Sequence, residues 1–118
     1  MNWEIKEDRP IWIQLKEQIA KMIISGNWSS DEKLPAVREL AKEAGVNPNT
    51  MQRALAALDQ EGLTVTNRTA GRMVTQDKNI IEAHRKEVAG YIMQTYLKDM
   101  KDIGIERDEA ISLLKEKE

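Results

Sequence analysis

The sequence predicts a mainly α-helical protein of the α+β type, in which one small β-hairpin interrupts a succession of helices. Two observations support this class. Apolar residues recur at helical spacing in several segments, most of which begin near a proline or end at a glycine. Residues 63–75 differ, because polar and apolar side chains alternate there on either side of a turn-like stretch.

The first predicted helix follows Pro10, whose missing N–H needs no partner in a first helical turn. Gly26 is expected to end this helix. Its apolar stripe consists of residues spaced mostly three or four apart: Ile11, Leu15, Ile19, Met22 and Ile23. Residues 1–9 are expected to form an extended arm, and residues 27–33 are expected to form a loop.

Two short helices are predicted next. Pro35 is expected to open the first of them, and Gly45 is expected to end it. The second covers about residues 47–61. Asn47 suits its N-cap because the side-chain oxygen can accept an unpaired amide of the first turn, and Pro48 suits the first helical position.

The helix that starts at Pro48 has a buried face and a polar face. Its apolar side chains recur at i, i+4 and i+7: Met51, Leu55 and Leu58. Polar side chains at its start lie mostly off that face: Asn49, Thr50, Gln52 and Arg53. Two short helices joined by a tight turn, with the second displaying polar side chains at its N-terminus, are what a helix-turn-helix requires.

The stretch LTVTNRTAGRMVTQ predicts a β-hairpin over about residues 64–75. Its turn is expected at NRTAG, which places Arg68 and Arg72 near the tip. A helix-turn-helix followed by a hairpin forms a winged helix. The sequence therefore predicts a winged-helix domain over residues 1–76.

Residues 77–118 predict a second domain, a tail of two helices. A long helix covers residues 77–103, Gly104 caps it, and a short helix spans about residues 107–115. A helix of about 25 residues with an apolar stripe is marginal alone in water, so a C₂ homodimer is expected to cover it. The predicted interface side chains are Val88, Tyr91, Ile92, Thr95, Tyr96, Met100, Ile111 and Leu114. The alternative is that they form only an intramolecular core.

Composition excludes several classes of function. The chain has no cysteine, so it forms no disulfide or thiolate site, and its one histidine, His84, is expected to be exposed or at the interface. No Gly-rich phosphate loop or clustered carboxylates suggest catalysis, so we expect no enzyme, no metal and no cofactor. No apolar run approaches the roughly 20 residues that span a bilayer, and the stretch MNWEIKEDRP lacks the basic and apolar regions of a signal peptide, so none is expected. A cytoplasmic protein without a membrane partner is expected.

Charge is distributed unevenly around the hairpin. The net charge is −2, and residues 1–76 hold ten basic and ten acidic residues. Residues 62–76, however, hold Arg68 and Arg72 with no acidic residue. A neutral protein with a locally basic tip must obtain any affinity for nucleic acid from that local charge.

The polar residues of the predicted helix-turn-helix suit double-stranded DNA. Asn and Gln can pair with adenine, Arg with guanine, and Thr with a methyl group or a phosphate. Arg38 in the preceding helix and the two wing arginines can reach the DNA backbone or the minor groove. Each feature alone also suits an ordinary solvated surface. Their joint placement in the order that a winged helix requires favours DNA binding.

Three stretches of this chain resemble the DNA-binding domain of the GntR family of bacterial transcription regulators: PIWIQLKEQIAKMIISG, KLPAVRELAKEAGVNPNTMQRALAALDQEGL and NRTAGRMVT. The short tail is similar to that of the YtrA-type subgroup, in which two tail helices dimerise. The residues above and this resemblance together give the predicted DNA-binding set: Arg38, Asn47, Pro48, Asn49, Thr50, Gln52, Arg53, Arg68, Thr69 and Arg72.

The wing departs from the family pattern. Thr69 stands where a glycine is usual, and Met73 replaces the usual aromatic residue, so only Gly71 remains in the turn. A non-glycine residue at positive φ costs about 1 kcal/mol or more, so the hairpin is expected to turn differently from that of its relatives.

The predicted function is a homodimeric, sequence-specific transcription regulator, a repressor that binds a palindromic operator. The resemblance implies control of an ABC-type transporter operon. A small-molecule effector, of unknown identity, would bind between the tail helices or at the dimer interface. The alternative is a winged-helix module for protein–protein contact that has lost DNA binding.

Overall fold

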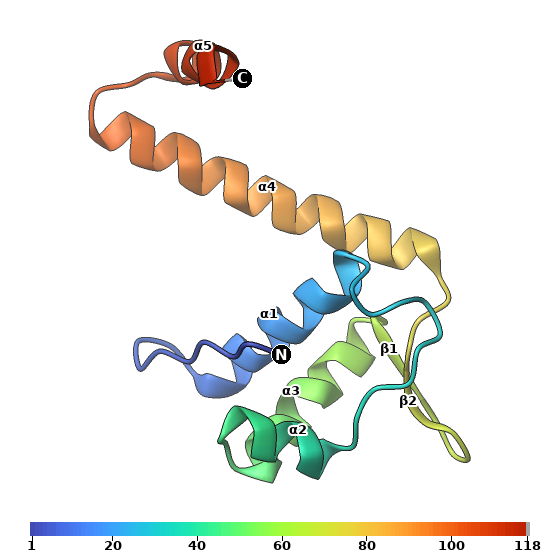
Figure 1. Cartoon of the computed structure of the whole chain (residues 1–118). Helices are drawn as coiled ribbons and strands as arrows, with labels where there is room; N and C mark the ends of the chain where they lie inside the picture. Colours follow the sequence, from blue (N-terminus) through green and yellow to red (C-terminus); the bar gives the residue numbers. More distant parts are fainter. Residues whose placement is uncertain (118) are drawn as a thin grey trace. The chain divides into compact units, whose positions relative to one another are not determined.

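A computed structural model describes residues 1–117 of the protein (Figure 1). The described chain holds a mainly helical fold with one two-stranded antiparallel sheet. Its elements, in chain order, are α1 (Ile11–Ile24), α2 (Val37–Ala44), α3 (Pro48–Gln60), β1 (Thr64–Asn67), β2 (Gly71–Val74), α4 (Lys78–Asp102) and α5 (Arg107–Lys117). The α+β prediction is confirmed. The chain divides into two compact units, Met1–Ala83 and His84–Glu118, so α4 belongs to both.

The core of the first unit lies where α1 and α2 pack against α3 (Figure 1). Many of the fully buried side chains come from the predicted periodic positions of α1 and α3: Leu15, Ile19, Ile23, Met51, Leu55 and Leu58. Ile11 belongs to the predicted stripe, but its side chain is 43% exposed. It is the first residue of α1, and the buried face of the helix begins only after it. Sequence periodicity therefore locates the core helices, but it extends the buried stripe one turn too far.

Helix α2 begins two residues later than expected. It starts at Val37 with Ala36 as its extended N-cap residue, so Pro35 lies before the helix. The reason is that Leu34, the residue before Pro35, is held against the hairpin. Its amide donates to the carbonyl of Arg72 at 2.9 Å. Gly45 ends the helix in the left-handed conformation at φ 70°, as glycine at this position predicts.

Residues 31–34 pair with β2, whereas the sequence predicts a loop over residues 27–33. The amide of Asp31 donates to Val74 at 3.0 Å, and the amide of Val74 donates to Glu32 at 2.8 Å. Lys33 and Met73 face each other in an antiparallel bridge. The segment preceding α2 thus contacts β2 through an isolated bridge and the backbone hydrogen bonds beside it, which fasten the hairpin to this segment.

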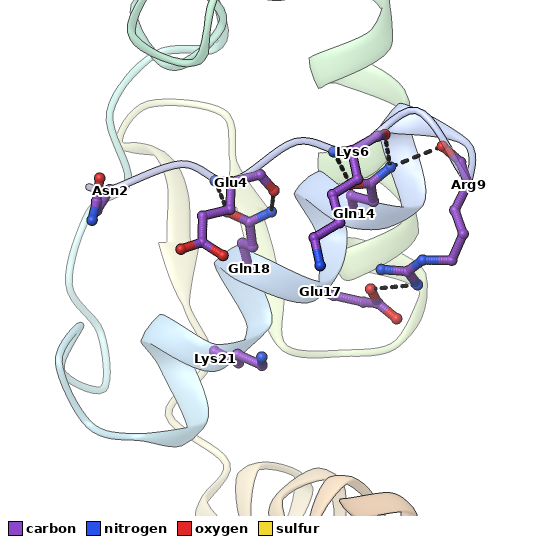
Figure 2. Close-up of a pocket in the computed structure, with 8 residues that line it drawn as sticks. All are labelled: Asn2, Glu4, Lys6, Arg9, Gln14, Glu17, Gln18 and Lys21. Atoms are coloured by element: carbon purple, nitrogen blue, oxygen red, sulfur yellow. Dashed lines mark hydrogen bonds and ion pairs between the residues drawn. The ribbon is translucent and has the colours of Figure 1, made fainter. Parts of the chain in front are cut away.

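The N-terminal arm is fastened to α1 by two glutamines (Figure 2). Gln14 accepts from the amide of Lys6 at 2.8 Å and donates to the carbonyls of Lys6 and Arg9. Gln18 repeats this pattern with the amide and the carbonyl of Glu4. These side-chain amides pair with backbone groups of the arm that would otherwise lack a partner within the protein. The predicted extended arm is therefore held against α1 without belonging to a sheet.

The second unit contains most of α4 and all of α5. Asp77 caps α4, since its side chain accepts from the amide of Asn79 at 2.9 Å. The first turn of α4 belongs to the first unit, where the Ile80 side chain packs against Gly62. The first unit therefore extends to Ala83, whereas the sequence suggests a boundary after Gln76. Among residues 1–117, no helix combines the length and the apolar character that crossing a bilayer requires.

Candidate nucleic-acid interface

The turn between α2 and α3 fixes the start of α3. Asn47 adopts extended geometry, and its Oδ1 accepts from the amide of Asn49 at 2.7 Å. Pro48 occupies the first helical position. This cap satisfies one otherwise unpaired amide and leaves the Nδ2 group of Asn47 available as a donor. The predicted cap is confirmed, and it presents the start of α3 in a fixed direction.

The exposed face of α3 carries polar side chains at the helix start. Asn49, Gln52 and Arg53 are exposed, while Thr50 is half-buried. The opposite face is fixed by Met51 and by Leu55, both fully buried. A buried face of this kind holds the polar face rigidly on the domain, as base or phosphate recognition requires.

Two predicted cations belong to the helices of the helix-turn-helix, Arg38 to α2 and Arg53 to α3. Arg38 is exposed in the first turn of α2. Arg53 stacks on a residue of α1 instead of extending freely, with its guanidinium carbon 4.3 Å from the centroid of the Trp12 ring. The sequence alone does not predict this stack, because it depends on how α1 packs against α3.

The wing turns through Gly71. Asn67 pairs with Gly71 across the hairpin, which leaves Arg68, Thr69 and Ala70 as the loop. Gly71 takes the positive φ, at 87°. Thr69 has a negative φ, and its amide and hydroxyl both donate to Oδ1 of Asn67 at 2.9 Å. The glycine normally found at this place is therefore not needed, and the expected strain at Thr69 does not arise.

Arg72 follows Gly71 at the turn of the wing, but its side chain is bound to α3, which the sequence does not predict. It stands opposite Thr66 in the strand, and its guanidinium binds Asp59 of α3 through Nε at 3.1 Å and Nη2 at 2.9 Å. Only 14% of its side chain is exposed. The register of the two strands directs the Arg72 side chain toward α3, where Asp59 pairs with its charge. Arg68 is therefore the arginine of the wing loop.

Asp59 joins α3 to both strands of the wing. It also accepts from the hydroxyls of Thr64 and Thr66, at 2.5 and 3.0 Å. Partial burial raises the pKa of Asp59, but the hydrogen bonds from Arg72, Thr64 and Thr66 outweigh it and hold the pKa below its ordinary value of 3.8. The carboxylate is therefore ionised at neutral pH and fixes the wing relative to the recognition helix.

Lys33 is a wing cation that the sequence alone does not reveal. Its stem lies over Gly71, since Cε is 3.3 Å from the place that a Cβ would occupy there. The residue is exposed. The sequence pattern of residues 27–33 is typical of a loop, and only the pairing of Lys33 with Met73 brings this cation beside the wing.

The second unit leaves much apolar surface exposed within the single chain. No residue of α4 is buried. Several residues of the predicted interface are among the exposed ones, at 75% for Tyr91, 57% for Ile92 and 52% for Leu114. Thr95 and Ile111 are exposed as well, whereas Val88, Tyr96 and Met100 are half-buried. Met93 and Ile103 add to this surface at 59% and 72%, and the predicted interface set omits both.

Comparison with known proteins identifies the family. Residues 13–74, which include most of α1, all of α2 and α3, and the hairpin, match the family described as bacterial regulatory proteins, gntR family. The chain belongs to the GntR family. It is a winged-helix transcription regulator and not an enzyme, as the sequence predicted.

Two relatives from Bacillus subtilis match this GntR protein over nearly its whole length. The uncharacterized HTH-type transcriptional regulator YhcF is 27% identical over 98% of this chain and 95% of its own. The HTH-type transcriptional repressor YtrA is 27% identical over 94% of this chain and 86% of its own. These matches support the YtrA-like subgroup. Other curated relatives are longer, and the chain spans 24% to 40% of their length.

Solved structures agree with this assignment. A GntR family transcriptional regulator from Listeria monocytogenes is 32% identical, with a TM-score of 0.86 over 95% of this chain and 98% of that one. The DNA-binding domain of AraR, solved in complex with the operator ORX1, is 29% identical with a TM-score of 0.55 over 64% of this chain and 92% of that one. The second structure is a family domain with operator DNA bound.

Proposed function

We propose that this GntR protein is a repressor that binds a palindromic DNA operator as a homodimer. The start of α3 reads bases in the major groove, and Arg38 and the wing bind the flanking backbone. The observation that carries the proposal is the exposed polar face at the start of α3, which the Asn47 cap and a fully buried apolar face hold in one orientation. The operator-bound AraR domain, which has the same fold, supports it.

The predicted side chains other than Arg72 have roles in this proposal. Asn49 and Gln52 present amides that suit adenine, and Thr50 suits a methyl group or a phosphate. Asn47 donates from Nδ2, and Pro48 allows close approach of the backbone at the helix start. Thr69 and Arg68 form the wing loop that meets the DNA backbone, with Lys33 as a further cation. Arg72 is withdrawn from this set by Asp59.

Dimerisation follows from the exposed apolar side chains of the second unit. Tyr91, Ile92 and Met93 are each more than half exposed, and an isolated helix cannot keep such a surface in water without a partner. A second copy offers the same surface, and a two-fold axis then places two recognition helices on two half-sites. The proposed interface is Val88, Tyr91, Ile92, Thr95, Tyr96, Met100, Ile111 and Leu114, with Met93 added.

The biological setting of the proposal comes from the YtrA-like resemblance. The protein would act in the cytoplasm of a bacterium. The genes that it regulates would include those of an ABC-type transporter. An effector, where one acts, would bind within the tail or at the dimer interface, because these regions lie outside the DNA-reading domain.

A mobility shift on the DNA upstream of the protein's own operon tests this function. Three arginines in each protomer, Arg38, Arg53 and Arg68, would neutralise about six phosphates per dimer, so log K should fall with log salt at a slope of about −5 or steeper. Arg38→Ala should weaken binding and flatten the slope. Lys21→Ala is the matched control, because it removes one positive charge from an exposed position of α1 outside the proposed interface.

The proposal fails if folded, dimeric protein gives no shift on this DNA and none on a genomic fragment library. It also fails if Arg38→Ala and Lys21→Ala reduce affinity equally. The first result would favour a winged helix that binds another protein.

A further inference from the structure

Trp12 stands beside the recognition helix although it belongs to α1. Its ring lies 4.3 Å from the guanidinium carbon of Arg53 and is itself half-buried. Arg53 follows Asn49 by one helical turn and is exposed. Among residues 1–117, no carboxylate forms an ion pair with Arg53.

Stacking on an aromatic ring differs in one respect from pairing with an acid. The ring attracts the flat face of a guanidinium, whereas the N–H donors lie around its edge. The edge of Arg53 therefore stays available to an anion while its side chain is held in place. Arg72 shows the contrast, since Asp59 occupies its Nε and Nη2 donors.

We propose that Trp12 is a positioning residue that holds Arg53 ready to bind a DNA phosphate beside the recognition helix. This inference rests on the proposed function. Arg53 is the sixth residue of α3, one helical turn after Asn49, and its guanidinium lies against Trp12 of α1. A cation at that place meets the wall of the groove, which is phosphate backbone. Ordering the arginine before binding lowers the entropy lost on binding.

The test is a double-mutant cycle on a random-sequence DNA duplex of about 30 base pairs at low salt, because a phosphate contact is independent of sequence. Trp12→Leu should weaken binding about two- to fivefold per protomer, the range expected for an exposed cation–π contact. Arg53→Ala should weaken binding and reduce the salt slope by about 1 per protomer. Trp12→Leu should then have no effect in the Arg53→Ala background.

Two further variants separate positioning from a general effect on the fold. Trp12→Phe keeps an aromatic face and should retain most of the affinity. Trp28→Leu removes another half-buried tryptophan, in the loop after α1, and should leave binding unchanged. Thermal unfolding of each variant, followed by circular dichroism, verifies that the domain is folded.

Additive losses from Trp12→Leu and Arg53→Ala would overturn the inference, as would an Arg53→Ala variant with an unchanged salt slope. Both results require that the unmodified protein binds the duplex, so they leave the proposed function intact. Absence of binding of the unmodified protein to this duplex would overturn this inference, whereas the proposed function is decided separately by the shift on the operon DNA and the genomic fragments.

Discussion

Asp59→Ala should destabilise the winged-helix unit by about 2–3 kcal/mol. The carboxylate accepts two bonds from Arg72 and one each from the hydroxyls of Thr64 and Thr66. The ion pair is intermediate between a surface pair, worth at most about 1 kcal/mol, and a buried pair, whose disruption costs about 3–5 kcal/mol. The side chains are 29% and 14% exposed, and the substitution would leave the less exposed partner, Arg72, without its anion.

Urea unfolding at pH 7, at fixed protein concentration, measures this loss. Asp59→Asn removes the charge and keeps one carbonyl oxygen, which can accept from one of the two threonine hydroxyls, while the other hydroxyl would have to accept from the new Nδ2 donor; a loss of about 1 kcal/mol is expected. Arg72→Met removes the cation but leaves the carboxylate its two hydroxyl bonds, so it should cost less than Asp59→Ala. The double variant should show a coupling of at least about 1 kcal/mol. Effects that add within about 0.5 kcal/mol would refute the reasoning, because groups without an interaction behave in that way.

The pH dependence of this loss has a definite sign. The pKa of Asp59 is lowered in the folded protein, so the unfolded chain binds its proton more tightly than the folded one. The stabilisation is fully present above the ordinary value of 3.8 and is lost as the pH falls through the lower, folded value. The difference in unfolding free energy between the unmodified protein and Asp59→Asn should therefore be constant near neutrality and shrink below about pH 4.

Three further perturbations follow from the contacts described. Ile92→Glu, in the exposed apolar surface of α4, should convert the proposed dimer to a monomer in sedimentation equilibrium, whereas Gln94→Glu, which adds the same charge on the same helix, should leave it dimeric. Asn47→Ala should lower the unfolding free energy by about 1 kcal/mol through loss of the cap. Gln14→Leu should release the arm, seen as faster hydrogen exchange at the amide of Lys6, and an unchanged rate would show that Gln14 does not hold the arm.

Local signals predict the helices well. Asn47 and Pro48 mark the start of α3, because capping depends only on neighbouring backbone groups. Apolar periodicity finds the buried positions of α1 and α3, because one packed face imposes a 3.6-residue repeat. The burial of Gln14 could not be predicted in this way, since its partners are carbonyl and amide groups of the arm and no periodic pattern marks them.

Partners distant in sequence could not be predicted. The pairing of Lys33 with Met73 depends on the hairpin register, and the stack of Arg53 on Trp12 depends on how two helices pack. The wing is a further example, since the sequence gives no reason to prefer either of its arginines, Arg68 or Arg72, as a DNA contact. Only the three-dimensional register brings Arg72 to an acid located 13 residues earlier in the chain.

The availability of a cation for DNA therefore depends on the chemistry of its neighbour. Asp59 neutralises Arg72 and occupies its donors, while Trp12 orders Arg53 and leaves both its charge and its donors in place. Asp59→Asn should release Arg72 from its anion while keeping an acceptor oxygen for one of the two threonine hydroxyls of the wing. Two released arginines per dimer would add about two phosphate contacts and steepen the salt slope by about 2. A variant that is less stable, and whose DNA affinity depends more steeply on salt, would show that Asp59 fixes the wing and at the same time keeps the charge of Arg72 from the DNA. An unchanged slope would show that Arg72 does not reach DNA even when it is unpaired.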